Sequence, residues 1–89
     1  MKTIPKDIAN IAHNRDFKVT IRVGRSGLTE AVYDELSAQL DSRKVVKIKI
    51  NRGLVEEKSD RQELFNEIAE HVGATLVDSR GNVAIYWRP

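Results

Sequence analysis

The chain has 89 residues and a formal net charge of +2, which is enough for one small domain with a modest core. Its composition, with 40% hydrophobic and 31% charged residues, is typical of a soluble globular protein, and the lack of cysteine excludes disulfides and thiolate metal sites. No stretch of the sequence is apolar enough for a signal peptide or a membrane span, so we expect a single domain over 1–89 in the cytoplasm.

Two predicted elements precede the first glycine. Apolar residues recur at helical spacing near the start, which predicts a short helix with one face formed by Ile4, Ile8, Ile11 and Ala12. Residues 17–23 then alternate strictly between apolar and polar side chains. This alternation predicts a half-buried strand, whose inner face consists of Phe17, Val19, Ile21 and Val23 and whose outer face consists of Lys18, Thr20 and Arg22.

The predicted strand leads into Gly24-Arg25-Ser26-Gly27, and a helical pattern follows. Thr29 is positioned to cap this helix, which we expect to end near Asp41 with an apolar stripe of Ala31, Val32, Leu36 and Leu40. Residues 43–51 return to a period of two. They predict a second strand, with one face formed by Val46, Ile48 and Ile50 and the other by Val45, Lys47 and Lys49.

After a polar connection at 51–59, a third helix is predicted from Ser59 or Asp60 to a C-terminal cap at Gly73. Its apolar stripe is Leu64, Phe65, Ile68, Ala69 and Val72. A closing hairpin follows, with strands at 74–78 and 83–87 around a turn at 79–82. In the last strand we expect Trp87 in the core and Tyr86 on the open face, where its ring would be available for stacking on a base.

The element order is thus a helix followed by β-α-β-α-β-β, an α/β fold with a four-stranded mixed sheet. Right-handed crossovers would place both long helices on one face and leave the other partly open. Three strands should run in one direction, and ligand sites of α/β sheets gather at the carboxyl ends of such strands. We expect basic side chains to converge there, namely Arg22, Arg25, Lys49, Arg52 and Arg80, with Lys18 and Lys47 on the adjoining open face.

The charges along the chain are consistent with a basic site of this kind. Residues 42–52 carry five basic side chains and no acid, whereas residues 54–72 carry six acids and two bases. The folded protein should therefore have a basic side and an acidic side. This pattern is expected of a nucleic-acid-binding protein, although solvated faces of small domains show it as well.

The turn at 24–27 is the candidate centre of the site. Two glycines three apart let a phosphate approach the backbone closely, while Arg25 adds positive charge and the following helix adds amide groups. Taken alone, Gly-x-x-Gly is more often a plain strand-to-helix turn, and the pair Lys47 and Lys49 is more often the solvated side of a strand. We find no pattern for a catalytic site or a cofactor, and His13 and His71 lack a metal-ligand spacing.

Several stretches in the same order resemble the CRM domain, the family of the bacterial YhbY proteins. These are Ile-Ala-His at 11–13, the strand end with Gly-x-x-Gly-Leu-Thr-Glu at 23–30, and the segments 46–50, 68–74 and 86–89, the last ending in Arg-Pro. The resemblance implies an RNA-binding domain related in fold to the C-terminal domain of translation initiation factor three. It also implies a glycine loop like that of KH domains.

Members of this family that stand alone are associated with precursors of the large ribosomal subunit, and plant relatives act in group II intron splicing. The resemblance therefore predicts a non-catalytic protein that binds structured ribosomal RNA and assists large-subunit assembly. The predicted RNA-binding residues are Gly24, Arg25, Ser26, Gly27, Arg22, Lys47, Lys49, Lys18, Arg52 and Arg80. The acidic connection at 53–59 and the adjacent Tyr86-Trp87 depart from the family pattern, and the exact RNA and the oligomeric state stay open.

Three other functions fit parts of the sequence. The glycine turn could hold a mononucleotide instead of RNA. Chromatin proteins of the Alba family have a similar β-α-β-α-β-β order, and that function predicts stable dimers that bind duplex DNA and RNA comparably. A protein-interaction module on the acidic face of the third helix would bind its partner without any dependence on Arg25.

Overall fold

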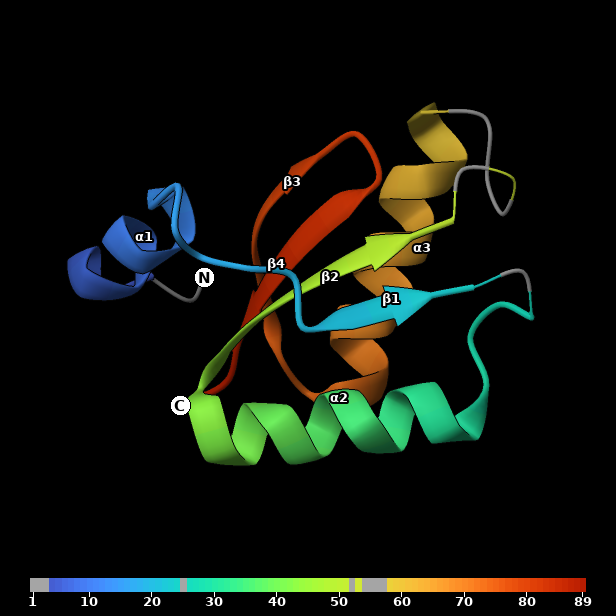
Figure 1. The fold of residues 1–89 in the computed structure, drawn as a ribbon, viewed down its shortest axis with the longest axis horizontal. Coiled ribbons are helices and arrows are strands. Elements are labelled where there is room, and N and C mark those ends of the chain that lie inside the picture. Colours follow the sequence, from blue (N-terminus) through green and yellow to red (C-terminus); the bar gives the residue numbers. More distant parts are fainter. Residues whose placement is uncertain (1–3, 25, 52, 54–57) are drawn as a thin grey trace.

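The computed structural model describes residues 4–24, 26–51, 53 and 58–89. Its helices and strands follow the predicted order and confirm the α/β fold class (Figure 1). The elements are α1 (Lys6–His13), β1 (Ile21–Val23), α2 (Glu30–Arg43), β2 (Val45–Ile50), α3 (Lys58–Val72), β3 (Thr75–Arg80) and β4 (Val83–Trp87). No helix among the described residues is long and apolar enough to cross a membrane.

The four strands form one mixed sheet in the order β1-β2-β4-β3. β1 and β2 are parallel, and β4 is antiparallel to both of its neighbours. β1, β2 and β3 therefore point in the same direction, as predicted, and the returning strand β4 lies between β2 and β3. A hairpin with a two-residue turn at Gly81–Asn82 joins the last two strands, and Gly81 adopts the positive φ of 55° that such turns require.

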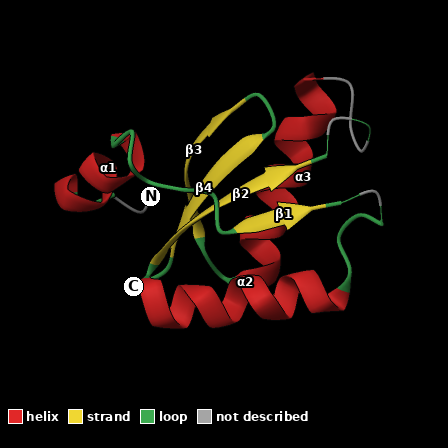
Figure 2. Cartoon of the chain, in the orientation of Figure 1, coloured by secondary structure: helices red, strands yellow, loops and turns green. Residues whose placement is uncertain are grey.

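Helices cover the two faces of the sheet unequally (Figure 2). α2 and α3 pack on one face and enclose the larger core, which includes Leu36 and Leu40 of α2 and Phe65 and Ile68 of α3. α1 packs on the opposite face over a smaller cluster around Ala12, Val45 and Ile85. We refer to these as the helix-covered face and the α1 face.

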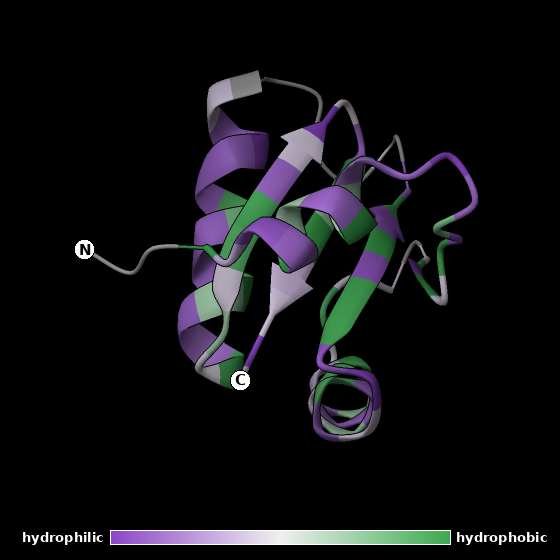
Figure 3. Cartoon of the chain, turned by 90° about the vertical axis from the view of Figure 1, so that its left-hand side faces the viewer, coloured by the Kyte–Doolittle hydropathy of each residue, from purple (hydrophilic) through white to green (hydrophobic). Residues whose placement is uncertain are grey.

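The side chains of β2 alternate between these two faces as predicted. In Figure 3, which colours the ribbon by hydropathy, this strand accordingly shows green hydrophobic and purple hydrophilic bands. Val46, Ile48 and Ile50 are each 1% exposed and belong to the larger core. Val45 packs under α1, and Lys47 and Lys49 lie on the same side. Because a strand has a side-chain period of two, this register fixes which basic groups reach the α1 face.

Both long helices begin or end at the predicted capping residues. The Thr29 side-chain oxygen accepts a hydrogen bond from the Val32 amide, which satisfies one free donor in the first turn of α2. At the end of α3, Gly73 has a φ of 64° and the Ala74 amide donates to the Ala69 carbonyl. This is the hydrogen bond of a glycine-ended helix, in which a left-handed residue turns the chain away from the axis.

Several predicted boundaries were wrong by a few residues. α2 extends to Arg43 and its Ala31 is exposed, so Ala31 is not part of the apolar stripe, whereas Tyr33 packs against the core. α3 begins at Lys58, and β3 continues to Arg80.

The largest boundary error is in β1, which begins only at Ile21. Phe17 packs in the cluster under α1, while Ile21 and Val23 lie in the larger core. The chain therefore passes from one face to the other between residues 17 and 21.

The orientation predicted for the last strand was also wrong. Tyr86 is fully buried in the larger core, where its hydroxyl donates to the Phe65 carbonyl at 2.8 Å. Trp87 is half-buried and packs in the cluster on the α1 face. Burial raises the pKa of the Tyr86 hydroxyl well above its ordinary value, with a smaller contribution from Tyr33. Tyr86 is therefore a structural residue and has no accessible ring for a base.

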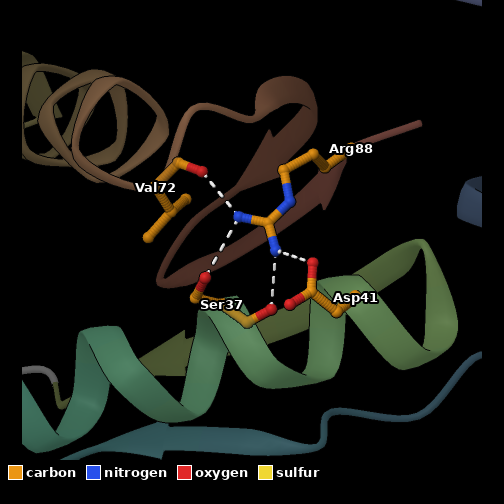
Figure 4. Close-up of polar contacts among 4 residues, drawn as sticks. All are labelled: Ser37, Asp41, Val72 and Arg88. Atoms are coloured by element: carbon orange, nitrogen blue, oxygen red, sulfur yellow. Dashed lines mark hydrogen bonds and ion pairs between the residues drawn. The ribbon is translucent and has the colours of Figure 1, made fainter.

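Arg88, just after β4, joins three elements of the helix-covered face (Figure 4). Its Nη1 donates to the Val72 carbonyl at 2.8 Å and to the Ser37 hydroxyl at 3.1 Å, and its Nη2 donates to the Ser37 carbonyl at 2.7 Å. Nη2 also forms an ion pair with Asp41 at 2.6 Å. The guanidinium thereby satisfies a carbonyl in the last turn of α3, which has no partner within its own helix.

Candidate functional site

A row of basic side chains crosses the α1 face at the carboxyl end of the parallel strands. Arg22 of β1 pairs in register with Lys49 of β2, Lys49 pairs with Val83 of β4, and Val83 pairs with Arg80 of β3. Register partners on neighbouring strands point to the same face, so Arg22, Lys49 and Arg80 form one transverse line. All three residues are exposed. We call this line the basic row.

The loops that follow these strands meet at the same end, as the strand directions predict. The Asn51 amide donates to the Val23 carbonyl, and the Ile50 amide donates to the Asn82 carbonyl, each at 2.8 Å. From α3, Arg61 donates to the Asn82 side-chain oxygen at 3.1 Å. The exits of β1 and β2 and the hairpin turn are thereby held beside the basic row by backbone and side-chain hydrogen bonds.

The glycine turn directly follows β1. The Gly27 amide donates to the Gly24 carbonyl at 3.0 Å, so the turn is closed by its own hydrogen bond and this amide is used within the protein. Gly27 has a φ of 77° and is buried, which explains its lack of a side chain. Gly24 has neither constraint: a Cβ placed on it would meet no described atom within 4 Å. Gly24 and Ser26 are exposed, and Arg25 lies outside the described residues.

Lys47 lies one step from the basic row toward α1. Its Nζ donates to the Phe17 carbonyl at 3.1 Å and is 6.0 Å from the centre of the Phe17 ring, at the outer limit of a cation–π contact. The Lys47 side chain is therefore held against the segment before β1, whereas the Lys49 side chain has no such contact among the described residues. Lys18 is exposed in that same segment, and Arg52 lies outside the described residues.

A groove of about 340 Å³ adjoins the basic row between the C-terminal end of α1 and the β3–β4 hairpin. We call it the α1 groove. Apolar side chains of Ala12, Val83 and Ile85 line part of it, and Asp78 lies within it. The remaining lining includes the basic residues Arg15, Lys47 and Arg80 together with His13. This volume is at the lower end of the range of roughly 300–1,000 Å³ for small-molecule sites.

Sequence reasoning missed the residues that α1 contributes to this groove. In the sequence, the polar residues at 13–16 indicate only the end of the first predicted helix, and His13 lacks a metal-ligand spacing. In the structure, the Asn14 side chain accepts a hydrogen bond from the Asp16 amide at 2.9 Å, and the Phe17 amide donates to the Asn14 carbonyl. This turn places Arg15 at the groove, and a tight polar turn after a helix was the available signal.

The outer surface of α2 and α3 has the opposite charge. Exposed acids on these helices include Glu30, Asp34, Glu35, Glu63, Glu67 and Glu70. The rings of Tyr33 and His71 stack between the helices with their centres 3.7 Å apart. Burial, with a smaller contribution from the Glu67 charge, raises the pKa of Tyr33. The protein therefore has an acidic side and a basic side, separated by the sheet.

The described residues contain no group of three or more His, Cys, Asp or Glu side chains that could hold a metal ion. They also contain one ion pair, between Arg88 and Asp41, so within the described residues the arginines and lysines of the basic row have no carboxylate partner. An array of exposed and unneutralised cations is suited to binding a polyanion.

Comparisons with known proteins show which family and which fold this chain is similar to. The family model described as the CRS1 / YhbY (CRM) domain matches residues 6–88. A protein of Pseudomonas aeruginosa, named as a probable RNA-binding protein, is 31% identical over 83 residues, which cover 93% of this chain and 75% of that protein. A solution structure of a hypothetical Staphylococcus aureus protein, described as a candidate RNA-binding protein, has a TM-score of 0.73 at 23% identity and covers 93% of this chain and 81% of that one.

Proposed function

Because this chain belongs to the CRS1/YhbY (CRM) domain family, we propose that it binds RNA through the basic row and the glycine turn beside it. The observation that carries the proposal is the register of the sheet, which aligns Arg22, Lys49 and Arg80 on one exposed line. The related protein of Pseudomonas aeruginosa is named for RNA binding, which supports the same conclusion.

The basic row would contact the sugar–phosphate backbone. Lysine and arginine that neutralise phosphates release condensed counterions, and this supplies affinity without selecting a sequence. The exposed Gly24 lets a backbone approach the end of β1 closely, since nothing in the described protein requires a glycine there. Arg25, within this turn, would add a further phosphate contact.

As the biological target we propose structured RNA of the large ribosomal subunit during its assembly, with the protein acting by binding and without catalysis. The family resemblance supports this assignment, and the mixed charge of the protein is compatible with it. A basic face would contact RNA while the acidic surface of α2 and α3 faces away, which limits binding to one orientation.

The proposal is tested with the double variant Arg22→Gln/Lys49→Gln, titrated with a large-subunit ribosomal RNA fragment at several salt concentrations. We expect weaker binding, and a plot of log affinity against log salt that is less steep by about 1 to 2, because two phosphate contacts are lost. The single variant Gly24→Ala tests the glycine turn by itself. It should weaken RNA binding without changing the free energy of unfolding.

The chain offers a matched control in Arg43→Gln/Lys44→Gln. This variant removes the same charge at the end of α2, where β2 begins, and therefore at the opposite end of β2 from Lys49. Equal loss of affinity in the two variants would show that only net charge matters and would contradict the proposed site. Equal binding to duplex DNA of the same length would favour the chromatin-type alternative, and crosslinking in cells followed by sequencing would identify the bound RNA.

A further inference from the structure

The α1 groove differs from the basic row beside it because it contains a carboxylate. Asp78 lies at an irregularity of β3, where the register shifts between Leu76 and Asp78 and the side chains of Val77 and Asp78 both lie on the α1 face. The Ser79 amide donates to Asp78 Oδ1 at 2.9 Å, which fixes the orientation of the carboxylate. Asp78 is half-buried, so this group is held in the groove and is not a freely rotating surface acid.

This carboxylate retains acceptor capacity. Within the described residues, the structure gives Asp78 neither a salt bridge to a basic side chain nor a hydrogen bond to Oδ2. A carboxylate has about four acceptor sites on its two oxygens, and only one is used here. The groove therefore offers a fixed hydrogen-bond acceptor among its basic side chains, and it is suited to a ligand that donates hydrogen bonds.

We propose that the α1 groove binds one unpaired guanine of an RNA strand that lies along the basic row, an inference that rests on the proposed function. Guanine carries two adjacent donors on its Watson–Crick edge, N1–H and the N2 amino group, and both would point at the Asp78 carboxylate. The other three RNA bases lack this pair of donors. Sequence-specific RNA binding commonly reads such edges on unpaired bases.

The surroundings of Asp78 match the rest of a nucleotide. Apolar side chains of the groove, chiefly the half-buried Val83, offer a surface for the base, and Arg15 and His13, which also line the groove, have planar side chains that would stack on it. Arg80 belongs both to the groove and to the basic row, so it would contact the phosphate next to the bound base. The volume of about 340 Å³ admits one nucleotide and excludes a duplex.

The test compares short fluorescent uridine oligonucleotides that carry one central guanosine, inosine or adenosine. We expect the guanosine form to bind roughly tenfold or more tightly than the adenosine form, with inosine in between because it lacks the N2 amino group. In Asp78→Asn this preference should disappear. Binding of the all-uridine oligonucleotide should be unchanged or tighter in that variant, since a negative charge beside the basic row is removed.

Glu63→Gln is the matched control, because it also removes one negative charge but lies exposed on α3 on the other side of the sheet. It should keep the preference for guanosine. Equal binding of the guanosine and adenosine forms by the native protein, or a preference that survives Asp78→Asn, would overturn the inference while leaving RNA binding intact. If the protein bound neither the oligonucleotides nor the large-subunit ribosomal RNA fragment even at low salt, the proposed function itself would fail.

Discussion

The two faces of the same four-stranded sheet differ in how far helices cover them. On the helix-covered face, α2 and α3 enclose a continuous core in which the hydroxyl of the fully buried Tyr86 is hydrogen-bonded. On the α1 face, a helix of 8 residues covers a small cluster and leaves a groove and the basic row exposed. The comparison teaches that the larger core and the proposed RNA-binding surface lie on opposite sides of one layer of backbone.

This separation follows from the alternation of side chains along each strand. β2 supplies Ile48 to the larger core and Lys47 and Lys49 to the α1 face, so a single strand serves both purposes. The charge separation follows too, because the acids lie on the outer surface of α2 and α3. Substitutions can therefore be chosen to affect one face alone.

The largest expected effect is on the helix-covered face, from Arg88→Ala. This change removes hydrogen bonds to Ser37, Asp41 and Val72 and leaves a carbonyl at the end of α3 without its partner. We expect the free energy of unfolding to fall by about 3 kcal/mol, measured by urea denaturation, because charged hydrogen bonds to half-buried carbonyls are the strong kind.

Asp41→Asn is the control for this prediction. The Asp41 side chain is 77% exposed, so its ion pair with Arg88 should contribute less than about 1 kcal/mol. A loss in Asp41→Asn as large as that in Arg88→Ala would mean that the surface ion pair, and not the contacts with the two helices, stabilises this corner. RNA affinity of the folded fraction should be unchanged in both variants.

A smaller effect on the same face is expected from Tyr86→Phe, which removes the hydrogen bond to the Phe65 carbonyl. We expect a loss of about 1 kcal/mol at neutral pH, since this carbonyl lies within α3 and keeps its helical partner. The pKa of Tyr86 is raised in the folded state, so the native protein should be fully stable below the ordinary tyrosine pKa of about 10 and lose stability as the pH rises above it.

In Tyr86→Phe, stability between neutral pH and strongly alkaline pH should therefore decline less than in the native protein. Tyr33→Phe serves as the comparison, because the pKa of Tyr33 is also raised but its ring is only half-buried. An identical pH dependence in the native protein and in Tyr86→Phe would show that the Tyr86 hydroxyl can reach water without unfolding.

The elements whose signals are local could be predicted from the sequence. Thr29 and Gly73 mark helix ends through hydrogen bonds within a few residues, and both were placed correctly. β2 could be oriented because its residues alternate between aliphatic and charged types. The meeting of three loops followed from strand direction alone, which is a property of the topology.

β4 could not be oriented for the opposite reason. β4 lies inside the sheet with helices packed on either side, so its residues 83–87 are apolar on both faces. The strand then has no alternation of polar and apolar residues that could indicate which side chains face which side. What decides its register is the partner of the Tyr86 hydroxyl, a carbonyl in α3 that lies 21 residues earlier in the sequence. No local pattern carries that information.

The α1 groove could not be predicted from the sequence because it forms only where α1 packs against the sheet. Nothing in the sequence of α1 states which part of the sheet it covers, and the groove exists only because α1 lies over β3 and β4. Asp78 is distant in sequence from Arg15 and His13, and none of the three stands out by itself. By contrast, Arg22 and Lys49 could be expected together, since both precede the ends of parallel strands.

The smallest predicted effect compares the same methyl deletion on the two faces, Ile48→Val and Ile85→Val. Ile48 is enclosed between the sheet and the long helices, so the loss of one of its methyl groups leaves a closed cavity. This change should lower the free energy of unfolding by about 1 kcal/mol. Ile85 is 5% exposed but borders the α1 groove, so the loss of its methyl group would leave a space that opens to the groove and should cost about 0.5 kcal/mol. Urea denaturation of both variants against the native protein measures the difference. Equal costs would mean that α1 closes tightly over the sheet in solution, and a closed α1 face would leave no room for a base beside Asp78.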